Sequence, residues 1–280
     1  MRICVGIVTR GRAELVQKAV ASAFSQVPPP DLIWVIEDGV VGKAFEWSGG
    51  GSVRITKLTE SKGYMAARQK MMMEAEADVY VSLDDDAWFL DPQAMAEAVR
   101  VMERDPKVAA VGFEILSPDC PQPSWRKGVE PAKMFIGCGH ALRLQAVREV
   151  GGYEEMPGSY GGEEKDLCLL LIDRGWKVVK LVGMPVWHEK TVLMREIKKQ
   201  RRSGVLNDLT LIARRCPWKH LVWNLGGNTW NQILFSARKP GERLIPTLLG
   251  LGDFLMNAPN IWATRKAVSL ETWKRYRKLI

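Results

Sequence analysis

The chain has 280 residues, of which 46% are hydrophobic and 26% charged, a balance typical of a water-soluble folded protein. No apolar stretch approaches the roughly 20 residues that a membrane-spanning helix requires, so we expect a protein that is soluble or lies on a membrane surface. The five cysteines are an odd number and form no Cys-x-x-Cys pair, which argues against a cysteine zinc site and against a disulfide framework; they are Cys4, Cys120, Cys138, Cys168 and Cys216.

The first half of the chain alternates strand and helix patterns. Short apolar runs predict strands at Ile3–Val8, Leu32–Ile36, Val53–Leu58, Val79–Leu83 and Val108–Phe113. Apolar residues at helical spacing predict helices at about residues 13–26, 64–77 and 91–104. This alternation predicts an α/β fold in which a mostly parallel, right-handed sheet is flanked by helices. The first apolar run is too short for a signal peptide, which together with the cysteine pattern indicates a cytoplasmic protein.

Beyond residue 116 the pattern becomes less regular. A Pro-rich stretch, residues 117–133, is longer than most connections, which favours a binding or lid role. An extended segment, a helix at about residues 163–174 and a strand at residues 177–182 follow it. From about residue 195 onward only helical patterns remain. We therefore place a boundary there, between a first domain of residues 1–195 and a helical region of residues 196–280.

The two parts of the chain differ in charge. Residues 191–280 contain 17 Lys and Arg against 5 Asp and Glu, which gives this region a net charge of +12. Because the whole chain has a net charge of +8, the first 190 residues carry a net charge of −4. This region also carries five of the eleven tryptophans, namely Trp218, Trp223, Trp230, Trp262 and Trp273. Such a surface suits anionic lipid headgroups. A basic lobe that only packs on the first domain fits equally well, whereas no helix-turn-helix, zinc-finger or RNP pattern supports nucleic acid.

Three consecutive aspartates, Asp84, Asp85 and Asp86, close the predicted strand Val79–Leu83. Their like charges repel one another unless a cation or a charged ligand compensates them. They lie at the carboxyl edge of the predicted sheet, where open α/β sheets bind their ligands. A solvated surface loop is the alternative for such a run.

A set of short motifs lies at the predicted strand and helix ends. In chain order they are Val8-Thr9-Arg10-Gly11-Arg12, Glu37-Asp38-Gly39, Gly63 with Ala67-Arg68, Asp84-Asp85-Asp86, Gly151-Gly152-Tyr153, Gly161-Gly162-Glu163-Glu164-Lys165-Asp166-Leu167, and His188. This ordered set resembles family-2 inverting glycosyltransferases with the GT-A fold, of the kind that builds bacterial cell-surface glycans. The resemblance covers residues 1–195, about two thirds of the chain. It implies a Rossmann-like GT-A sheet that binds a nucleotide sugar.

A glycosyl transfer of this kind releases a nucleoside diphosphate, whose developing charge a divalent cation neutralises as a Lewis acid. Mn²⁺ and Mg²⁺ favour carboxylate oxygens, and Mn²⁺ also accepts imidazole. The resemblance implies that Asp86 and His188 bind Mn²⁺ or Mg²⁺. It places Asp84 near the ribose and the metal, with Asp85 beside it on the donor side or in a structural role. A structural role is also the alternative for a lone histidine such as His188.

An acceptor hydroxyl loses a proton as it attacks, and a carboxylate near the anomeric carbon can serve as the general base. Glu163 and Glu164 follow two glycines at a predicted helix start, where free amides and the helix dipole keep carboxylates ionised. The resemblance implies that Glu164 is the base, with Glu163 as second choice. It also implies that Gly162 and Asp166 contact the acceptor. Alternatively, the glutamates only favour the start of the helix.

The resemblance assigns the donor nucleotide to residues of the first half. Thr9 and Arg12 follow the first strand, at the edge where a nucleotide would lie. Asp38 can accept a hydrogen bond from a pyrimidine base, with Glu37 as the alternative. Arg68 matches a family arginine that reaches the base or a phosphate, although it can also be a helix-surface charge. Because the acidic pair here begins with Glu instead of Asp, the donor stays open between UDP-, dTDP- and GDP-linked sugars.

We therefore expect a metal-dependent inverting hexosyltransferase. It would move a sugar from a nucleotide-diphosphate sugar to a glycan or lipid-linked acceptor in polysaccharide or glycolipid synthesis, with a membrane surface at the inner face of the cell membrane as a further partner. The oligomeric state stays open. A sugar nucleotidyltransferase is the alternative, but it should begin with a glycine-rich loop that the turn after the first strand lacks. A basic nucleic-acid-binding module is the non-enzyme alternative, against which the negative first 190 residues argue.

Overall fold

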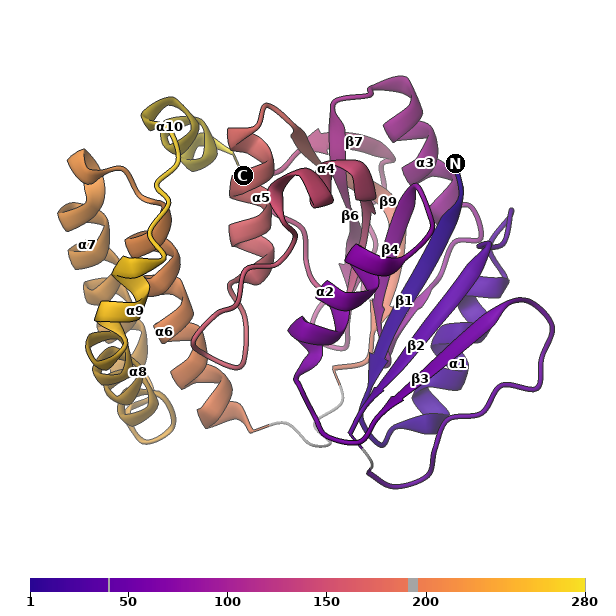
Figure 1. The fold of residues 1–280 in the computed structure, drawn as a ribbon, viewed down its shortest axis with the longest axis horizontal. Coiled ribbons are helices and arrows are strands. Elements are labelled where there is room, and N and C mark those ends of the chain that lie inside the picture. The colour runs from indigo at the N-terminus through magenta and orange to yellow at the C-terminus, as the bar shows by residue number, and fades with distance from the viewer. Residues whose placement is uncertain (40, 191–195, 280) are drawn as a thin grey trace.

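A nine-stranded sheet, counted over the described residues, forms the centre of the first 190 residues (Figure 1). The computed structural model describes residues 1–39, 41–190 and 196–279. The strands lie in the order β3-β2-β1-β4-β8-β6-β9-β5, and β7 also pairs with β9. Their bounds are β1 Ile3–Thr9, β2 Leu32–Asp38, β3 Val53–Leu58, β4 Val79–Asp84, β5 Ala87–Phe89, β6 Val108–Leu116, β7 Gly128–Pro131, β8 Gly139–Arg143 and β9 Lys177–His188.

The sheet is parallel at one end and mixed at the other. Strands β3, β2, β1 and β4 run parallel to one another, and β6 is parallel to β9. Strand β8 runs antiparallel to both β4 and β6, while β5 and β7 run antiparallel to β9. The predicted α/β class is confirmed. The sheet holds more antiparallel pairs than the sequence pattern indicated. Strand β8 runs against both of its neighbours, and β5 and β7 are too short to give a strand pattern.

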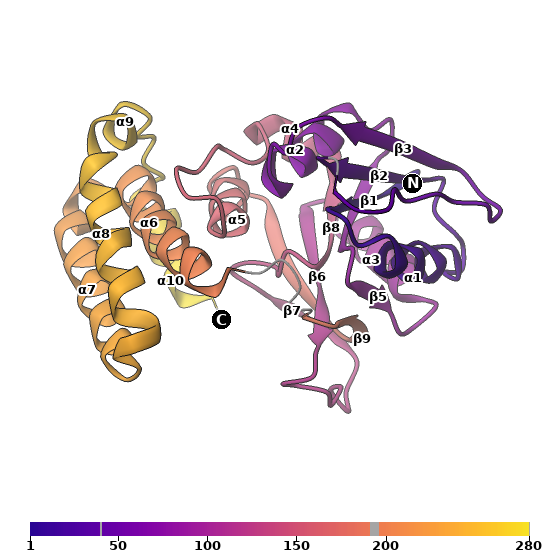
Figure 2. The same ribbon diagram turned by 90° about the horizontal axis from the view of Figure 1, so that it is seen from below.

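Helices cover both faces of the sheet (Figure 2). Their bounds are α1 Ala13–Phe24, α2 Tyr64–Glu74, α3 Ala94–Arg104, α4 Leu144–Val150 and α5 Glu163–Asp173. Helices α1 and α3 bury their apolar residues on one face, and α2, α4 and α5 on the other. Because side chains alternate along a strand, Val5 and Ile7 of β1 belong to the first layer and Cys4 to the second. Burial of apolar surface on both faces holds the strand ends in fixed positions.

Strand β9 is longer than the predicted strand at residues 177–182. The register between β6 and β9 shifts between Phe113 and Glu114, and Gly183 of β9 has a φ of 78°. The Gly183 N–H donates to the carboxylate of Glu114 at 2.9 Å, which stabilises this bulge. The strand then continues to His188, which pairs with Ala87 of β5. The bulge thus carries His188 to the edge of the sheet where the aspartates lie.

The C-terminal region is helical, as predicted. Its elements are α6 Ile197–Arg215, α7 Trp218–Ala237, a short π-helical turn η1 Pro240–Leu244, α8 Ile245–Met256, α9 Ala258–Ala263 and α10 Leu270–Lys278. Figure 1 shows these helices on the far side of α5 from the sheet. Arg215 of α6 is fully buried and donates to both carboxylate oxygens of Asp166 in α5, at 2.6 and 2.8 Å. Among the helices described, none combines the length and the apolar character needed to cross a membrane.

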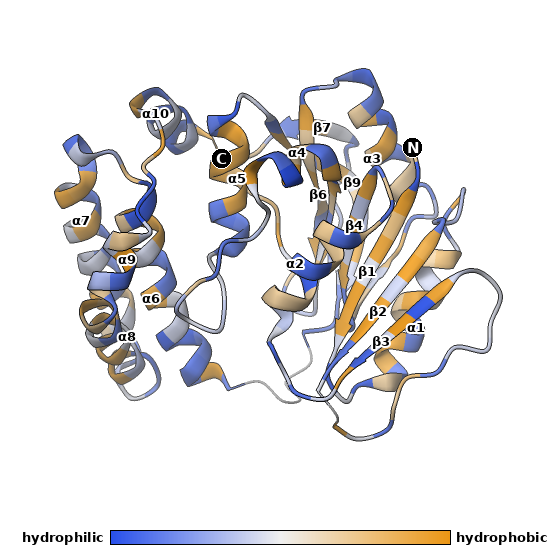
Figure 3. Cartoon of the chain, in the orientation of Figure 1, coloured by the Kyte–Doolittle hydropathy of each residue, from blue (hydrophilic) through white to orange (hydrophobic). Residues whose placement is uncertain are grey.

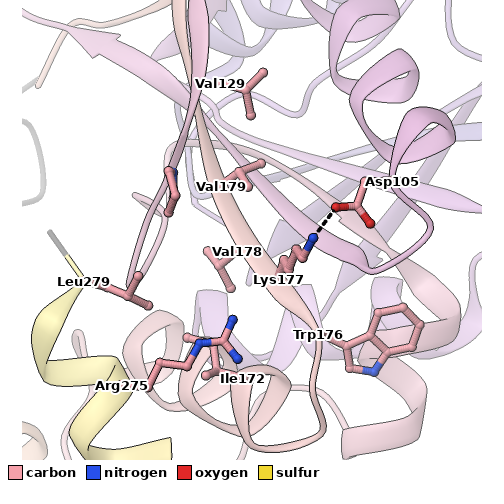
Figure 4. Close-up of a pocket in the computed structure, with 10 residues that line it drawn as sticks. Asp105, Val129, Ile172, Trp176, Lys177, Val178, Val179, Arg275 and Leu279 are labelled. Atoms are coloured by element: carbon pink, nitrogen blue, oxygen red, sulfur yellow. Dashed lines mark hydrogen bonds and ion pairs between the residues drawn. The ribbon is translucent and has the colours of Figure 1, made fainter.

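A pocket of about 310 Å³ lies between β9, α5 and α10 (Figure 4). Trp176, Val178 and Leu279 contribute apolar walls, and Lys177 pairs with Asp105 at 2.6 Å. Lys177 begins β9, whereas the aspartate edge lies where that strand ends. The pocket therefore lies at the opposite end of the strand from the candidate site described below.

Candidate active site

The three aspartates lie at the carboxyl edge of the sheet, where β4 ends between β1 and β8. Asp84 is the last residue of β4, and Asp85 and Asp86 form the turn into β5. Since β5 pairs with the end of β9, the side chain of His188 faces this turn. The His188 Nε2 atom lies 3.3 Å from Asp86 Oδ1 and 3.7 Å from Asp84 Oδ2. The structure thus brings together three residues that are up to 104 positions apart in the sequence.

The charges of the triplet are partly compensated by cations of the protein itself. Asp85 is buried, forms an ion pair with Arg12 at 2.6 Å and accepts a hydrogen bond from Thr9 Oγ1 at 2.7 Å. Burial raises the pKa of Asp85 to about 6, although Arg12 and Thr9 act in the opposite direction. Arg12 also lies 3.6 Å from Asp86, and Arg68 forms an ion pair with Asp84. Thr9, Arg12 and Asp85 therefore form one connected group at the predicted nucleotide edge.

The donor atoms at this edge suit a divalent cation. Asp84, Cys138 and His188 each offer one ligand atom, and these atoms all lie within 4.8 Å of one another. Asp86 extends the set, because its carboxylate is also close to His188. Two carboxylates and an imidazole fit Mn²⁺, and the carboxylates alone fit Mg²⁺. Burial raises the pKa of the Cys138 thiol well above its usual range, which makes this sulfur a weaker ligand than the carboxylates.

Cys138 was not predicted to belong to the site, and no local pattern marks it. It precedes β8, the strand that lies directly beside β4. Its neighbour Gly137 is also part of the site, because a side chain there would collide with the carboxylate of Glu164 and the guanidinium of Arg68. A glycine at this position leaves room for both groups, and a larger residue would displace the Glu164 carboxylate.

Glu163 and Glu164 begin α5 after Gly161 and Gly162, which both have positive φ angles. Glu163 is fully buried and accepts a hydrogen bond from the Tyr64 hydroxyl at 2.6 Å. We expected the helix start to keep both carboxylates ionised. Instead, burial together with the charge of Glu163 raises the pKa of Glu164 well above its usual range, so desolvation outweighs the helix dipole.

Arg68 connects the aspartate edge to the candidate base. It is buried at 3% exposure, which contradicts the alternative of a helix-surface charge. Burial alone would lower the pKa of Arg68, but the charge of Asp84 raises it above the usual value. The positive charge of Arg68 in turn acts to lower the pKa of Glu164. A single buried cation thus faces both the predicted metal ligands and the predicted base.

Glu37 and Asp38 hold loops in this structure. Asp38 accepts hydrogen bonds from the Ser61 hydroxyl at 2.7 Å and from the N–H groups of Lys62 and Gly63 at 2.7 and 3.0 Å. It thereby shapes the loop that leads into α2, the helix that bears Arg68. Glu37 accepts a hydrogen bond from the N–H of Phe45 at 2.7 Å. Contact of Glu37 or Asp38 with a nucleotide base stays a prediction.

Asp166 faces the interior in this structure, and its contact with an acceptor stays a prediction. Its side chain is 1% exposed, and both of its carboxylate oxygens accept hydrogen bonds from Arg215. Asp166 therefore joins α5 to α6 inside the molecule. Gly162 is also buried, and a side chain there would press against Asn207 of α6. The structure gives Gly162 the role of turning the chain into α5 at a φ of 101°.

Asn207 is a second residue of the site that the sequence did not reveal. Its amide nitrogen donates to the carbonyl groups of Gly158, Tyr160 and Gly161, at 2.9, 3.1 and 2.6 Å. Its carbonyl oxygen accepts from the N–H of Gly158 at 2.8 Å. The loop immediately before Glu163 and Glu164 is thus held by a side chain from beyond residue 195. The helical region is part of the framework of the site, although the sequence pattern changes at the predicted boundary.

Solved structures of other proteins share this fold. S. aureus TarS in complex with UDP-GlcNAc superposes with a TM-score of 0.66 at 12% identity, over 95% of this chain and 84% of that one. A Pyrobaculum calidifontis mannosyltransferase, PcManGT, in complex with GDP-Man and Mn²⁺ has a TM-score of 0.59 at 15% identity, over 99% and 79%. GalNAc-T7 with UDP, GalNAc and Mn²⁺ has a TM-score of 0.61 at 14% identity, over 77% of this chain; the chain spans about half of that protein, 48%.

At these identities the likeness shows the fold, which is the predicted GT-A fold. No match was found among curated protein sequences. The family model for glycosyl transferase family 2 matches residues 4–151, just over half of the chain. This segment contains the aspartate triplet, Arg12 and Arg68. The chain therefore belongs to glycosyl transferase family 2.

Proposed function

We propose that this protein transfers a hexose from a nucleotide-diphosphate sugar to an acceptor hydroxyl with inversion at the anomeric carbon. The observation that carries the proposal is the convergence of Asp84, Asp86 and His188 at one strand edge, with Arg68 linking that edge to Glu164. Family membership supports the transfer of a sugar. Structural neighbours solved with UDP-GlcNAc and GDP-Man support a nucleotide-sugar donor.

Asp84, Asp86 and His188 would hold the divalent cation. When bound, this cation neutralises the charge that develops on the departing nucleoside diphosphate. The neighbours solved with Mn²⁺ support such a cofactor, and the choice between Mn²⁺ and Mg²⁺ stays open. Arg12 and Arg68 add positive charge at the same edge, where it stabilises the diphosphate before and after the bond breaks.

Glu164 would act as the general base. Its carboxylate accepts the proton of the acceptor hydroxyl while that oxygen bonds to the anomeric carbon and the bond to the diphosphate breaks. The raised pKa makes the carboxylate a stronger base once it is ionised. Glu163 is fixed by Tyr64 directly beside Glu164, which supports a positioning role for it in place of direct catalysis.

The acceptor belongs to a glycan or to a lipid-linked glycan of polysaccharide or glycolipid synthesis, and the enzyme works from the cytoplasm at the inner membrane face. The basic, Trp-rich C-terminal region supports this part of the proposal.

A thermal-shift experiment with UDP, dTDP and GDP tests the donor site. One of these nucleotides should raise the melting temperature in the presence of Mn²⁺ and much less in its absence. Asp86→Asn should abolish the Mn²⁺-dependent part, whereas Asp105→Asn, at the opposite end of the sheet, should leave it unchanged. Equal stabilisation of wild type and Asp86→Asn would refute the metal site.

The reaction products distinguish the proposed activity from the alternatives. A glycosyltransferase releases a nucleoside diphosphate from a nucleotide sugar, whereas a sugar nucleotidyltransferase produces or consumes pyrophosphate. We expect slow, metal-dependent release of nucleoside diphosphate from the correct donor and no pyrophosphate chemistry. A salt-dependent rise in melting temperature with DNA, without any nucleotide effect, would favour the nucleic-acid-binding alternative.

A further inference from the structure

Helix α8 packs with its small and polar residues inward and its large apolar residues outward. Pro246, Thr247 and Gly250 are buried, and a side chain at Gly250 would collide with α6. The exposed large residues recur at helical spacing and are Ile245, Leu248, Leu249, Leu255 and Met256. Met256 exposes 82% of its surface and Leu255 71%. A helix that only covers a water-soluble core would have these two faces exchanged.

Helix α7 repeats this inverted pattern. Of its 20 residues, only Leu221 and Ser236 are buried, while Trp223 exposes 83% of its surface and Trp230 61%. A polar network lies between the helices instead of an apolar core. Ser236 and Thr247 share a hydrogen bond of 2.7 Å, and Arg201 of α6 donates to both hydroxyls at 3.0 Å. Figure 3 shows orange, hydrophobic segments of α7 and α8 on the side of the molecule that lies farthest from the sheet.

Cationic side chains border this apolar face. A groove of about 520 Å³ lies between the start of α6 and α8, with Lys198, Lys199 and Arg202 on one side and Ile245 and Leu249 on the other. Asp253 neutralises Arg202 through two hydrogen bonds, at 2.5 and 2.6 Å. Glu196 also lines the groove and lies 3.7 Å from Lys199, so the positive charge at the groove comes mainly from Lys198. Arg238 and Lys239 add charge where α7 ends, and both are exposed.

A second copy of the chain, a nucleic acid and a lipid bilayer are the candidate partners for this face. Its combination of exposed tryptophan and leucine with cations distinguishes between them. A second copy of the chain would match the apolar residues, but a symmetric contact would bring two basic borders together. A nucleic acid would match the cations and leave the apolar residues in water. An anionic lipid bilayer satisfies both, because apolar side chains enter the interface while cations meet the headgroup phosphates.

We propose that the outward face of α7 and α8 docks on an anionic lipid bilayer, with these helices lying in the plane of the interface. Lipid phosphates would occupy the groove beside Lys198 and Lys199. This agrees with the absence, among the described helices, of one able to cross a membrane. The docking surface does not depend on catalysis; that it serves a lipid-linked acceptor rests on the proposed function.

Vesicle flotation with the full chain tests the proposal. Vesicles of phosphatidylcholine with roughly 30% phosphatidylglycerol should bind the protein, vesicles of phosphatidylcholine alone should bind it weakly, and salt should reduce the difference. The double variant Leu248→Glu and Leu255→Glu should lose partitioning by roughly tenfold or more. The single variant Leu255→Glu should already lose part of this binding. Leu90→Glu is its matched control, since Leu90 is 48% exposed in the first domain and the one substitution adds the same single charge. Its partitioning should equal that of wild type.

A second variant separates charge from apolar contact. Lys198→Gln with Lys199→Gln should lower binding to the anionic vesicles by roughly fivefold for each lysine and leave binding to phosphatidylcholine unchanged. Equal flotation of the double leucine variant and of Leu90→Glu overturns the proposal, as does a solution dimer that the leucine variant dissociates. Nucleotide-dependent melting shifts of the variants report that the donor site is folded. Normal vesicle binding by a protein without transferase activity would count against the proposed function alone.

Discussion

Glu164 is held where its charge is costly, beside buried Glu163 at the start of α5. The folded-state pKa of Glu164 lies above its unfolded value, so the folded protein binds this proton more tightly. Stability is therefore lost as the pH rises from the unfolded pKa through the folded pKa. The same rise in pH ionises the base and should increase the transfer rate. The position of Glu164 thus lowers the stability of the folded protein at high pH and makes its carboxylate a stronger base.

Glu164→Gln should reveal both effects. We expect the turnover rate to fall by roughly 10² to 10⁴, because the base is lost. The melting temperature should rise relative to wild type above the ordinary pKa range of glutamate, because no charge has to be buried. Rates and melting curves across a pH series measure this, with exposed Glu76→Gln as the control that changes neither. If Glu164 only supported the helix start, the variant would be less stable and its pH dependence would match wild type.

The positive charge of Arg68 compensates the negative charge of Asp84 when no metal ion is bound. Arg68→Met should leave Asp84 without its nearest counter-charge, and the free energy of unfolding should fall by about 3 kcal/mol. Mn²⁺ should restore part of this loss, because it binds the same carboxylates. Urea unfolding with Mn²⁺ and with a chelator measures the effect. An equal Mn²⁺ effect on wild type and variant would contradict a shared role of Arg68 and the metal.

Among the elements beyond residue 195, α6 has the most direct effect on the site, because it contributes Asn207. Asn207 makes four hydrogen bonds to the loop of residues 158–161, which sets the position of Glu164. Asn207→Ala should lower the turnover rate by roughly tenfold to a hundredfold and leave the affinity for the donor nucleotide unchanged, because the nucleotide edge is held by other residues. Steady-state kinetics and nucleotide titration separate the two quantities. Asn231→Ala, an exposed change on α7, is the control.

The elements also show how far the sequence could predict the site. The aspartate triplet and the pair Glu163 and Glu164 each stand at the end of a clear strand or helix pattern, and the structure places them at the predicted edge. Cys138 and Asn207 have no such pattern. Asn207 reaches Gly158, 49 positions away, and only the packing of α6 brings the two together. The pKa of Glu164 was predicted in the wrong direction because the degree of burial cannot be read from a helix start.

At the scale of the whole molecule, the sheet domain and the helical region share their interior. Arg215 of α6 is fully buried and binds Asp166 of α5 as well as Glu154. Leu169 of α5 packs in one apolar cluster with Cys216, Leu221 and Trp273. Removing one partner of such a buried ion pair leaves an uncompensated charge, which costs about 3 to 5 kcal/mol. The change of sequence pattern near residue 195 therefore does not interrupt the contact between α5 and α6, and the division into two domains stays a prediction.

We expect the chain to unfold in one cooperative transition. Urea curves followed by far-UV circular dichroism and by tryptophan fluorescence, to which the C-terminal region contributes five of eleven tryptophans, should coincide. Arg215→Met should shift both curves together to lower urea, whereas Arg238→Met, at an exposed site, should shift neither. Two separate transitions in wild type, or a variant in which only the fluorescence curve moves, would show that the helical region folds independently. If the curves coincide, the helical region and the sheet unfold together. The loop before Glu164, which Asn207 of α6 holds, is then ordered only while α6 is folded.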